Sequence, residues 1–293
     1  MSLTFEERNE EYRLYIEKYL KDHISRFADE PQKQLFDAMG YSLLAGGKRL
    51  RPIFVFDFCR MCGGDWKSAA PLAAALEMIH TYSLIHDDLP CMDNDDFRRG
   101  RPTNHKVYGE AIAILAGDGL LTDAFALAAT AQLPDPGQMS LAIGVLAENA
   151  GSLGMVGGQV LDIMSEEREL TEEEVVDIQS RKTGALIKAA CVLGAIAGGG
   201  SEEQIRAAAS FAGLLGLAFQ IRDDMLDVIG TAEEMGKGVG TDAQKNTFVR
   251  LYGLEKCEKL VQKYTNTAIE MLSIFDDRAY MTALARSLTD RRV

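Results

Sequence analysis

Six aspartates in two clusters are the residues whose type and spacing predict chemistry most clearly. The first cluster is Asp87, Asp88 and Asp93, and the second is Asp223, Asp224 and Asp227. Carboxylates this close repel one another, and beside apolar helices they are also costly to remove from water. A divalent cation removes both costs, and hard oxygen ligands with room for water and phosphate oxygens describe a magnesium site. One cluster alone could equally be a solvated acidic face.

The spacing within each cluster predicts how the chain must position it. Gln220, Asp223 and Asp227 lie three or four residues apart, so they share one face of the helix expected over 202–229. Asp87 and Asp93 do not have a same-face helical spacing, so the chain must turn to bring them together. Two acidic clusters at the ends of apolar helices could face each other across a bundle, where metal sites are built from facing helices.

Positive charge is gathered in two loops. Residues 47–52 read Gly-Lys-Arg-Leu-Arg-Pro and run into a helix start, where free backbone N–H groups favour an anion. Residues 98–102 read Arg-Arg-Gly-Arg-Pro and follow the first aspartate cluster. In a chain of net charge -13, diphosphate binding explains two such loops better than chance surface charge. They lack the spacing and the preceding strand of a nucleotide-binding P-loop.

Bulk composition narrows the classes of function. The net charge of -13 argues against nonspecific binding to nucleic acid or to an anionic membrane, because a negative field repels both. The acidic N-terminus has no secretory signal, and no apolar stretch reaches the length needed to span a bilayer. Five cysteines, an odd number, fit a reducing cytosol, and we expect Cys59 and Cys62 to be buried and structural. These features predict a cytoplasmic protein.

Helical spacing of apolar residues dominates the whole chain, which predicts an all-α fold. All seven prolines lie at or before Pro136, which suits long uninterrupted helices in the second half. We expect helices over 33–45, from 52 onward, over 66–88 and over 202–229, and loops over 89–109 and 236–240. No internal repeat or low-complexity linker is present, so we expect a single domain over 1–293.

With these residues assembled, the sequence resembles the trans-prenyl diphosphate synthases, and most closely the bacterial farnesyl diphosphate synthases. The resemblance runs from about residue 40 to 247. The motifs that carry it are GGKRLRP at 46–52, HTYSLIHDDLPCMDNDDFRRGRPTNH at 80–105, GGQ at 157–159, KTG at 182–184 and FQIRDDMLD at 219–227. Their number and order make coincidence very improbable.

The resemblance implies a fold and a role for each site residue. The fold would be a single-domain bundle of about ten or more helices around a deep central cavity, usually as a homodimer. Asp87, Asp93 and Asp223 would bind three Mg²⁺ ions (Mn²⁺ as a substitute), with Asp88, Asp224 and Asp227 as further ligands or supporting partners. Arg98, Lys182 and Lys237 would hold the allylic diphosphate; Gly47, Lys48, Arg51, His80 and Arg99 would hold isopentenyl diphosphate. Lys182, Thr183 and Gln220 would act at the reacting centre.

The implied reaction is head-to-tail condensation of dimethylallyl or geranyl diphosphate with isopentenyl diphosphate. Metal ions and fixed cations would stabilise the leaving diphosphate, and a dry apolar pocket would protect the allylic cation. The expanded first motif together with Tyr82 resembles enzymes that stop at farnesyl diphosphate, with Tyr82 and Ser83 at the floor of the cavity.

Several alternatives remain open at this point. The chain could make geranyl or geranylgeranyl diphosphate instead. Terpene cyclases share the fold, but they use one diphosphate and would not need the loop that carries Lys48 and Arg51. A catalytically silent subunit of a heteromeric synthase would be expected to lose one aspartate cluster. A helical protein with calcium-stabilised acidic ends would leave the basic loops unexplained.

Overall fold

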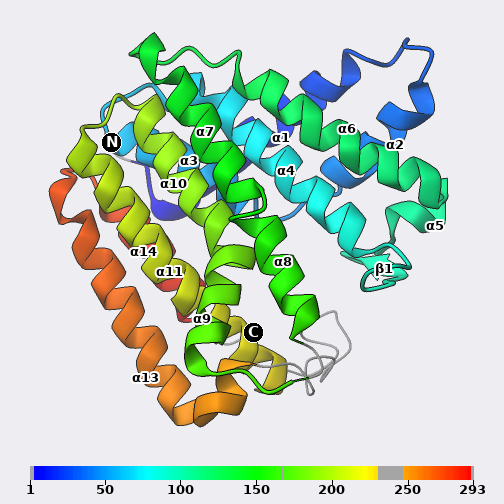
Figure 1. Ribbon diagram of the computed structural model, residues 1–293. Coiled ribbons are helices and arrows are strands. Elements are labelled where there is room, and N and C mark those ends of the chain that lie inside the picture. The colour runs from blue at the N-terminus through cyan, green and yellow to red at the C-terminus, as the bar shows by residue number, and fades with distance from the viewer. Residues whose placement is uncertain (1–2, 166–167, 230–246, 292–293) are drawn as a thin grey trace.

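Helices make up almost all of the computed structural model, which describes residues 3–165, 168–229 and 247–291 (Figure 1). The α-helices of the first half are α1 (Phe5–Ser25), α2 (Lys33–Leu43), α3 (Leu50–Met61), α4 (Ala70–Asp87), α5 (Asn104–Tyr108) and α6 (Glu110–Ala128). Those of the second half are α7 (Met139–Ala150), α8 (Met155–Met164), α9 (Glu172–Gln179), α10 (Ala185–Ala197), α11 (Glu202–Ile229), α13 (Phe248–Met271) and α14 (Ala279–Thr289). The prediction of an all-α fold is confirmed.

Shorter elements connect these helices. They are the 3₁₀ turns η1 (Trp66–Ala69), η2 (Pro136–Gln138) and η4 (Leu272–Ile274), the π-helical turn η3 (Ser180–Gly184), and the strands β1 (Phe97–Arg98) and β2 (Arg101–Pro102). Local sequence explains where two of the helices begin. Thr4 and Glu7 form a reciprocal capping box at the start of α1, and Thr171 and Glu174 form another before α9.

The centre of the bundle is α10, which is apolar on all sides and buried throughout except at Lys188. It packs against α3, α4, α7 and α11, and the pairs α4–α6 and α11–α13 extend the bundle on either side. Small residues permit the closest approach: a Cβ at Gly194 of α10 would lie 2.4 Å from the carbonyl oxygen of Val55 in α3. In Figure 1, α4 ends beside β1, and the yellow end of α11 lies near the bottom of the bundle.

The segment 89–109 is more ordered than the loop that we predicted. It contains the helix α5 and an antiparallel hairpin in which Phe97 pairs with Pro102 and Arg98 with Arg101. Arg99 and Gly100 make the turn with φ values of 53° and 72°, the left-handed geometry that suits a two-residue hairpin. The hairpin therefore fixes the positions of the paired arginines. Cys59 is buried as expected, but Cys62 is only half-buried.

Three helical stretches are long and apolar enough, by length and composition alone, to cross a membrane: Glu110–Ala128, Pro136–Met164 and Glu202–Ile229. The prediction that no stretch reaches this length was therefore wrong. The error arose because scattered charged residues interrupt the apolar runs without lowering their average hydropathy enough. The last of the three carries Asp223, Asp224 and Asp227 near its end.

Candidate active site

The turn after α4 brings Asp93 back to Asp87. The backbone N–H of Asp93 donates a hydrogen bond to the carbonyl oxygen of Asp87 at 2.8 Å, which confirms that the chain turns between them. Burial raises the pKa of Asp87 to about 6; the charges of Asp93 and Asp88 add to this rise, and those of Lys182 and Arg98 oppose it. A cation at this point would relieve the cost of the buried negative charge.

Asp88 differs from its neighbour because it already has a cationic partner. Its side chain is buried, and its Oδ1 accepts a hydrogen bond from Nε of Arg98 at 2.7 Å. Burial raises the pKa of Asp88, and the hydrogen bond and charge of Arg98 oppose that rise. The contact orients Arg98, a residue expected to hold the allylic diphosphate. The structure therefore favours a supporting role for Asp88 over direct metal binding.

The two basic loops meet at Gly47. The guanidinium of Arg99 donates to the carbonyl oxygen of Gly46, and a Cβ at Gly47 would lie 2.9 Å from Cζ of Arg99. Glycine suits position 47 because of its φ of 130°, and a side chain there would also have to displace the Arg99 guanidinium. Lys48, the next residue, is exposed. The structure thus brings together Gly47 and Arg99, which are distant in the sequence and which the family resemblance assigns to one diphosphate.

His80 and Arg51 lie in the same positively charged region. Burial lowers the pKa of His80 well below its ordinary value, and the charges of Arg51 and Arg99 lower it further. Burial likewise lowers the pKa of Arg51, whose Nε is enclosed and has no hydrogen-bond partner. An enclosed guanidinium with an unsatisfied donor is suited to an incoming anionic oxygen.

Arg49 of the basic loop lies in the protein core, and it was not identified as a site residue from the sequence. Its backbone is left-handed, with φ of 50°, and its side chain is buried in the core. The guanidinium, fully buried, bonds Glu17 at 2.8 Å, Glu77 at 2.7 Å and the carbonyl oxygen of Leu43 at 2.7 Å. Only its place between two predicted ligands could have drawn attention to it.

The π-helical turn η3 links the two aspartate clusters. Its Lys182 is close enough to influence Asp87, and the hydroxyl of Thr183 donates to Oε1 of Gln220 at 3.2 Å. Gln220 in turn donates to Asp224 at 3.0 Å, and Asp224 also accepts from the backbone N–H of Phe248 at 2.9 Å. Asp224 is buried by these contacts, which favour a supporting role for it.

Asp162 on α8 is a second residue that the sequence did not indicate. Its carboxylate lies 2.6 Å from Nζ of Lys182. One turn earlier on α8, a Cβ at Gly158 would lie 2.3 Å from the backbone nitrogen of Lys182, so only glycine allows α8 to pack against η3. The GGQ motif could have suggested the close packing, whereas nothing local pairs Asp162 with a residue twenty positions away.

We expect Asp162→Asn to weaken prenyl transfer about tenfold and to leave the fold intact. The neutral amide would no longer hold the Lys182 ammonium by charge, and a partly exposed ion pair of this kind stabilises the fold by only about 0–1 kcal/mol. Steady-state kinetics and thermal denaturation would measure the two effects. An unchanged kcat/KM would show that Lys182 needs no such support. Asp177→Asn, which breaks an exposed pair with Arg181 on α9 and η3, is the matched control.

Arg291 lies against the second aspartate cluster and was also missed. Its guanidinium donates to Oδ1 of Asp223 and stands 4.6 Å from the centre of the Phe219 ring. Asp227, one turn further along α11, is half-buried. Lys237, expected to hold the allylic diphosphate, lies outside the described residues.

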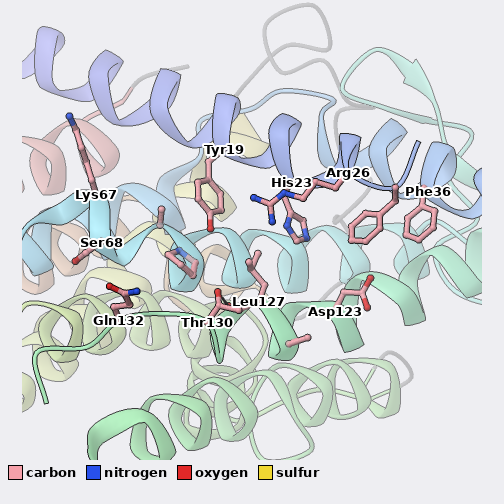
Figure 2. Close-up of a pocket in the computed structure, with 14 residues that line it drawn as sticks. Tyr19, His23, Arg26, Phe36, Lys67, Ser68, Asp123, Leu127, Thr130 and Gln132 are labelled. Atoms are coloured by element: carbon pink, nitrogen blue, oxygen red, sulfur yellow. Dashed lines mark hydrogen bonds between the residues drawn. The ribbon is translucent and has the colours of Figure 1, made fainter. Parts of the chain in front are cut away.

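Two small cavities lie at the predicted site, and a larger one lies elsewhere. One of 40 Å³ has Asp88, Arg98 and Arg99 in its wall. Another of 40 Å³ has Arg51, Thr183 and Phe219 in its wall among apolar side chains. A cavity of 710 Å³ lies at the opposite end of α4, where His23 and Tyr19 of α1 face Asp123 and Leu127 of α6 (Figure 2). A choice of site by cavity volume alone would therefore have missed the aspartates.

The described residues hold no set of three His, Cys, Asp or Glu side chains that is ready to bind a metal ion. Asp88 and Asp224 are buried against their partners, whereas the side chain of Asp223, although paired with Arg291, is 39% exposed. These observations fit a site where Asp87, Asp93 and Asp223 supply part of the oxygen ligands and where phosphate oxygens and water supply the rest. The raised pKa of Asp87 supports the same interpretation.

Comparison with known proteins gives one consistent family. Residues 32–279 match the polyprenyl synthetase family. Large subunit 1 of the chloroplastic heterodimeric geranylgeranyl pyrophosphate synthase of Arabidopsis thaliana is 48% identical over 273 residues, which cover 90% of this chain and 73% of that protein. A solved FPP/GFPP synthase from Zymomonas mobilis has a TM-score of 0.88 and 37% identity, covering 98% of this chain and 100% of that chain. The geranylgeranyl pyrophosphate synthetase of Pyrococcus horikoshii has a TM-score of 0.87 and 31% identity over 98% of both chains.

Proposed function

Since this chain belongs to the polyprenyl synthetase family, we propose that it is a Mg²⁺-dependent prenyltransferase that condenses an allylic diphosphate with isopentenyl diphosphate. The observation that carries the proposal is the presence of two groups of cationic side chains near the first aspartate cluster. Arg51 and Arg99 lie close enough to His80 to lower its pKa, and Lys182 and Arg98 lie close enough to Asp87 to oppose the rise of its pKa. Two anion sites suit an enzyme that joins two diphosphates.

Some site residues would bind the two diphosphates, and others would exclude water from the reacting centre. Arg98 and Lys182 would hold the allylic diphosphate beside Asp87, and Lys48 and Arg51 would hold isopentenyl diphosphate. Bound Mg²⁺ would supply positive charge to the leaving diphosphate, held by Asp87, Asp93 and Asp223. Gln220, fixed by Asp224, would keep the Thr183 hydroxyl in place at the reacting centre, and Phe219 and Ile187 would exclude water.

Incubation of the protein with dimethylallyl and isopentenyl diphosphates, with and without Mg²⁺, tests this proposal. We expect prenyl products of increasing length only when Mg²⁺ is present, identified by chromatography after dephosphorylation. The absence of any elongated product under both conditions would refute the proposed reaction. A product from dimethylallyl diphosphate alone would instead indicate a cyclase or lyase.

We further propose that Tyr82 limits the product to farnesyl diphosphate. Tyr82 is only 6% exposed and lies in the helix that ends at Asp87, while Ser83 donates to the carbonyl oxygen of His80 at 2.9 Å. A large ring near the metal end of α4 would stop a chain that grows along this helix. The names of the curated relatives instead favour geranylgeranyl diphosphate, and no comparison favours the farnesyl product as strongly. Geranylgeranyl diphosphate is therefore the second candidate product.

Tyr82→Ala should lengthen the product by at least one isoprene unit. Removal of the ring opens space that an apolar chain fills favourably, since burial of each methylene stabilises by about 0.8 kcal/mol. The measurement is the chain-length distribution at a fixed substrate ratio. An unchanged distribution would remove Tyr82 from the floor of the cavity. Tyr108→Ala, in α5, is a suitable control because Tyr108 contacts the chain of α2 instead.

We also propose that the protein forms a homodimer in the cytoplasm. Its support is the exposure of large apolar side chains on α6, α7 and α8, among them Ile114, Leu115, Leu141, Val160 and Met164. Clustered apolar side chains at a surface are typical of association sites. Sedimentation of the protein would test the state, because a monomer at micromolar concentration would contradict the proposal.

A further inference from the structure

His86 joins the end of α4 to the backbone of α6. It precedes Asp87 directly, and its Nε2 lies 3.0 Å from the carbonyl oxygen of Ile114. A carbonyl oxygen only accepts hydrogen bonds, so the imidazole proton must lie on Nε2 for this contact to form. The contact ties the last turn of α4 to a fixed point on the neighbouring helix, which runs beside α4 in Figure 1.

Gly117 provides the space in which this imidazole lies. A Cβ at Gly117 would be 2.1 Å from Nε2 and 2.5 Å from Cδ2 of His86. Carbon atoms in contact are normally separated by about 3.5–4.0 Å, so any side chain at this position would displace the ring. Glycine has no conformational role here, because residue 117 lies in the interior of α6. Glycine is needed at this position because the imidazole of His86 occupies the space that a side chain would fill.

His86 also limits the movement of Tyr82. The two residues are four apart on α4 and therefore share a face. Their ring centres are 5.7 Å apart and their planes meet at 78°, an edge-to-face contact. The chain of contacts therefore runs from the α6 backbone through Gly117 and His86 to the ring of Tyr82.

We propose that His86 and Gly117 are positioning residues for product chain length. Gly117 and the Ile114 carbonyl fix His86, and His86 fixes the ring of Tyr82 in the orientation that stops elongation. The inference rests on the proposed function, in which Tyr82 faces the growing chain. In this proposal each residue acts through the tyrosine and not by contact with the substrate.

The test is a double-mutant cycle read out as product length. Gly117→Ala displaces the imidazole, and His86→Ala removes it; the third variant carries both changes. An edge-to-face contact is worth about 0.5–1.5 kcal/mol, which corresponds to a change of about 2- to 10-fold in the ratio of the next longer product to the wild-type product. We expect each single variant to shift the ratio by this amount, and the double variant to shift it no further than His86→Ala.

The product ratio is a partition within each active site, so a smaller folded fraction or a slower reaction does not change it. Gly144→Ala on α7 is the matched control, because a Cβ there meets nothing within 4 Å. If Gly117→Ala does not fold, the His86→Gln variant tests the inference instead. Its amide can still donate to the Ile114 carbonyl oxygen, but it has no ring to pack against Tyr82. We expect it to shift the product ratio as His86→Ala does.

Three outcomes separate the inference from the proposed function. A wild-type protein that makes no prenyl product refutes the proposed function itself. A wild-type protein that elongates, with a wild-type product ratio in Gly117→Ala and His86→Gln, overturns the inference alone. Fully additive shifts in the double variant would also overturn it, because Gly117 would then act by a route that does not pass through His86.

Discussion

Asp87→Asn and Asp223→Asn, made singly, should each lower kcat/KM for prenyl transfer about 10²- to 10³-fold. Each substitution removes an anionic oxygen that would hold Mg²⁺ against the leaving diphosphate, and one well-placed electrostatic contact to a developing charge contributes about that much. The amide is nearly the same size as the carboxylate, so packing is preserved. Steady-state kinetics at saturating Mg²⁺ is the measurement.

The fold should not weaken in Asp87→Asn. Burial raises the pKa of Asp87, which means that its charged form is disfavoured in the folded protein, and a neutral amide removes that cost. Asp96→Asn is the matched control, because Asp96 lies in the loop that follows Asp87 and pairs with Lys106 at 2.6 Å on the surface. Near-wild-type turnover in either active-site variant would contradict the assignment of that aspartate to the metal.

Removal of the metal gives an independent check of the same site. Chelation with EDTA should abolish prenyl transfer, and excess Mg²⁺ should restore it, while the far-UV circular dichroism and the melting temperature change little. This expectation follows because the main apolar core joins residues of helices from α1 to α14, so it does not depend on contacts made by the aspartates. A large loss of structure in EDTA would instead favour a protein whose acidic ends are stabilised by calcium.

Periodicity and motif spacing were sufficient to predict the fold class and much of the site. The apolar spacing predicted long helices, and α11 matches the predicted range 202–229. The spacing of Asp87 and Asp93 required a turn, and the hydrogen bond between their backbones provides it. These features are local, so the order of residues along the chain determines them.

The rest depends on contacts between residues far apart in the sequence. Asp162 meets Lys182 because Gly158 lets α8 approach η3, and Arg291 meets Asp223 from the opposite end of the chain. The hairpin around Arg99 was predicted as loop because strands of two residues leave no alternation to detect. The π-helical form of η3 was equally invisible, since it depends on the packing of that turn.

Arg49→Met should destabilise the fold by about 3–5 kcal/mol, because it leaves Glu77 buried without its partner. The methionine fills much of the same volume, so the loss reports mainly on charge. Guanidinium denaturation gives the unfolding free energy. Arg13→Met is the matched control: Arg13 pairs with Glu10 at 2.6 Å on an exposed helix face, where such pairs contribute about 0–1 kcal/mol.

Three companion variants identify the cause of that loss. Arg49→Met combined with Glu77→Gln should recover part of the stability, because the unpaired buried charge is gone. Arg49→Lys should fall between wild type and Arg49→Met, since one ammonium cannot reach Glu17, Glu77 and the Leu43 carbonyl together. Arg49→Gly should be as unstable as Arg49→Met; a stable glycine variant would mean that the left-handed backbone, not the ion pairs, governs this position.

The same network should affect one substrate more than the other. Arg49 lies between Lys48 and Arg51 in the chain, at the N-cap of α3, and its buried ion pairs anchor the backbone from which both side chains extend. In Arg49→Lys, which retains the charge, we expect the KM for isopentenyl diphosphate to rise about tenfold while the KM for the allylic substrate changes much less, because Lys182 and Arg98 have separate supports in Asp162 and Asp88. Equal changes in both KM values would show that Arg49 stabilises the whole bundle without a specific role in the basic loop.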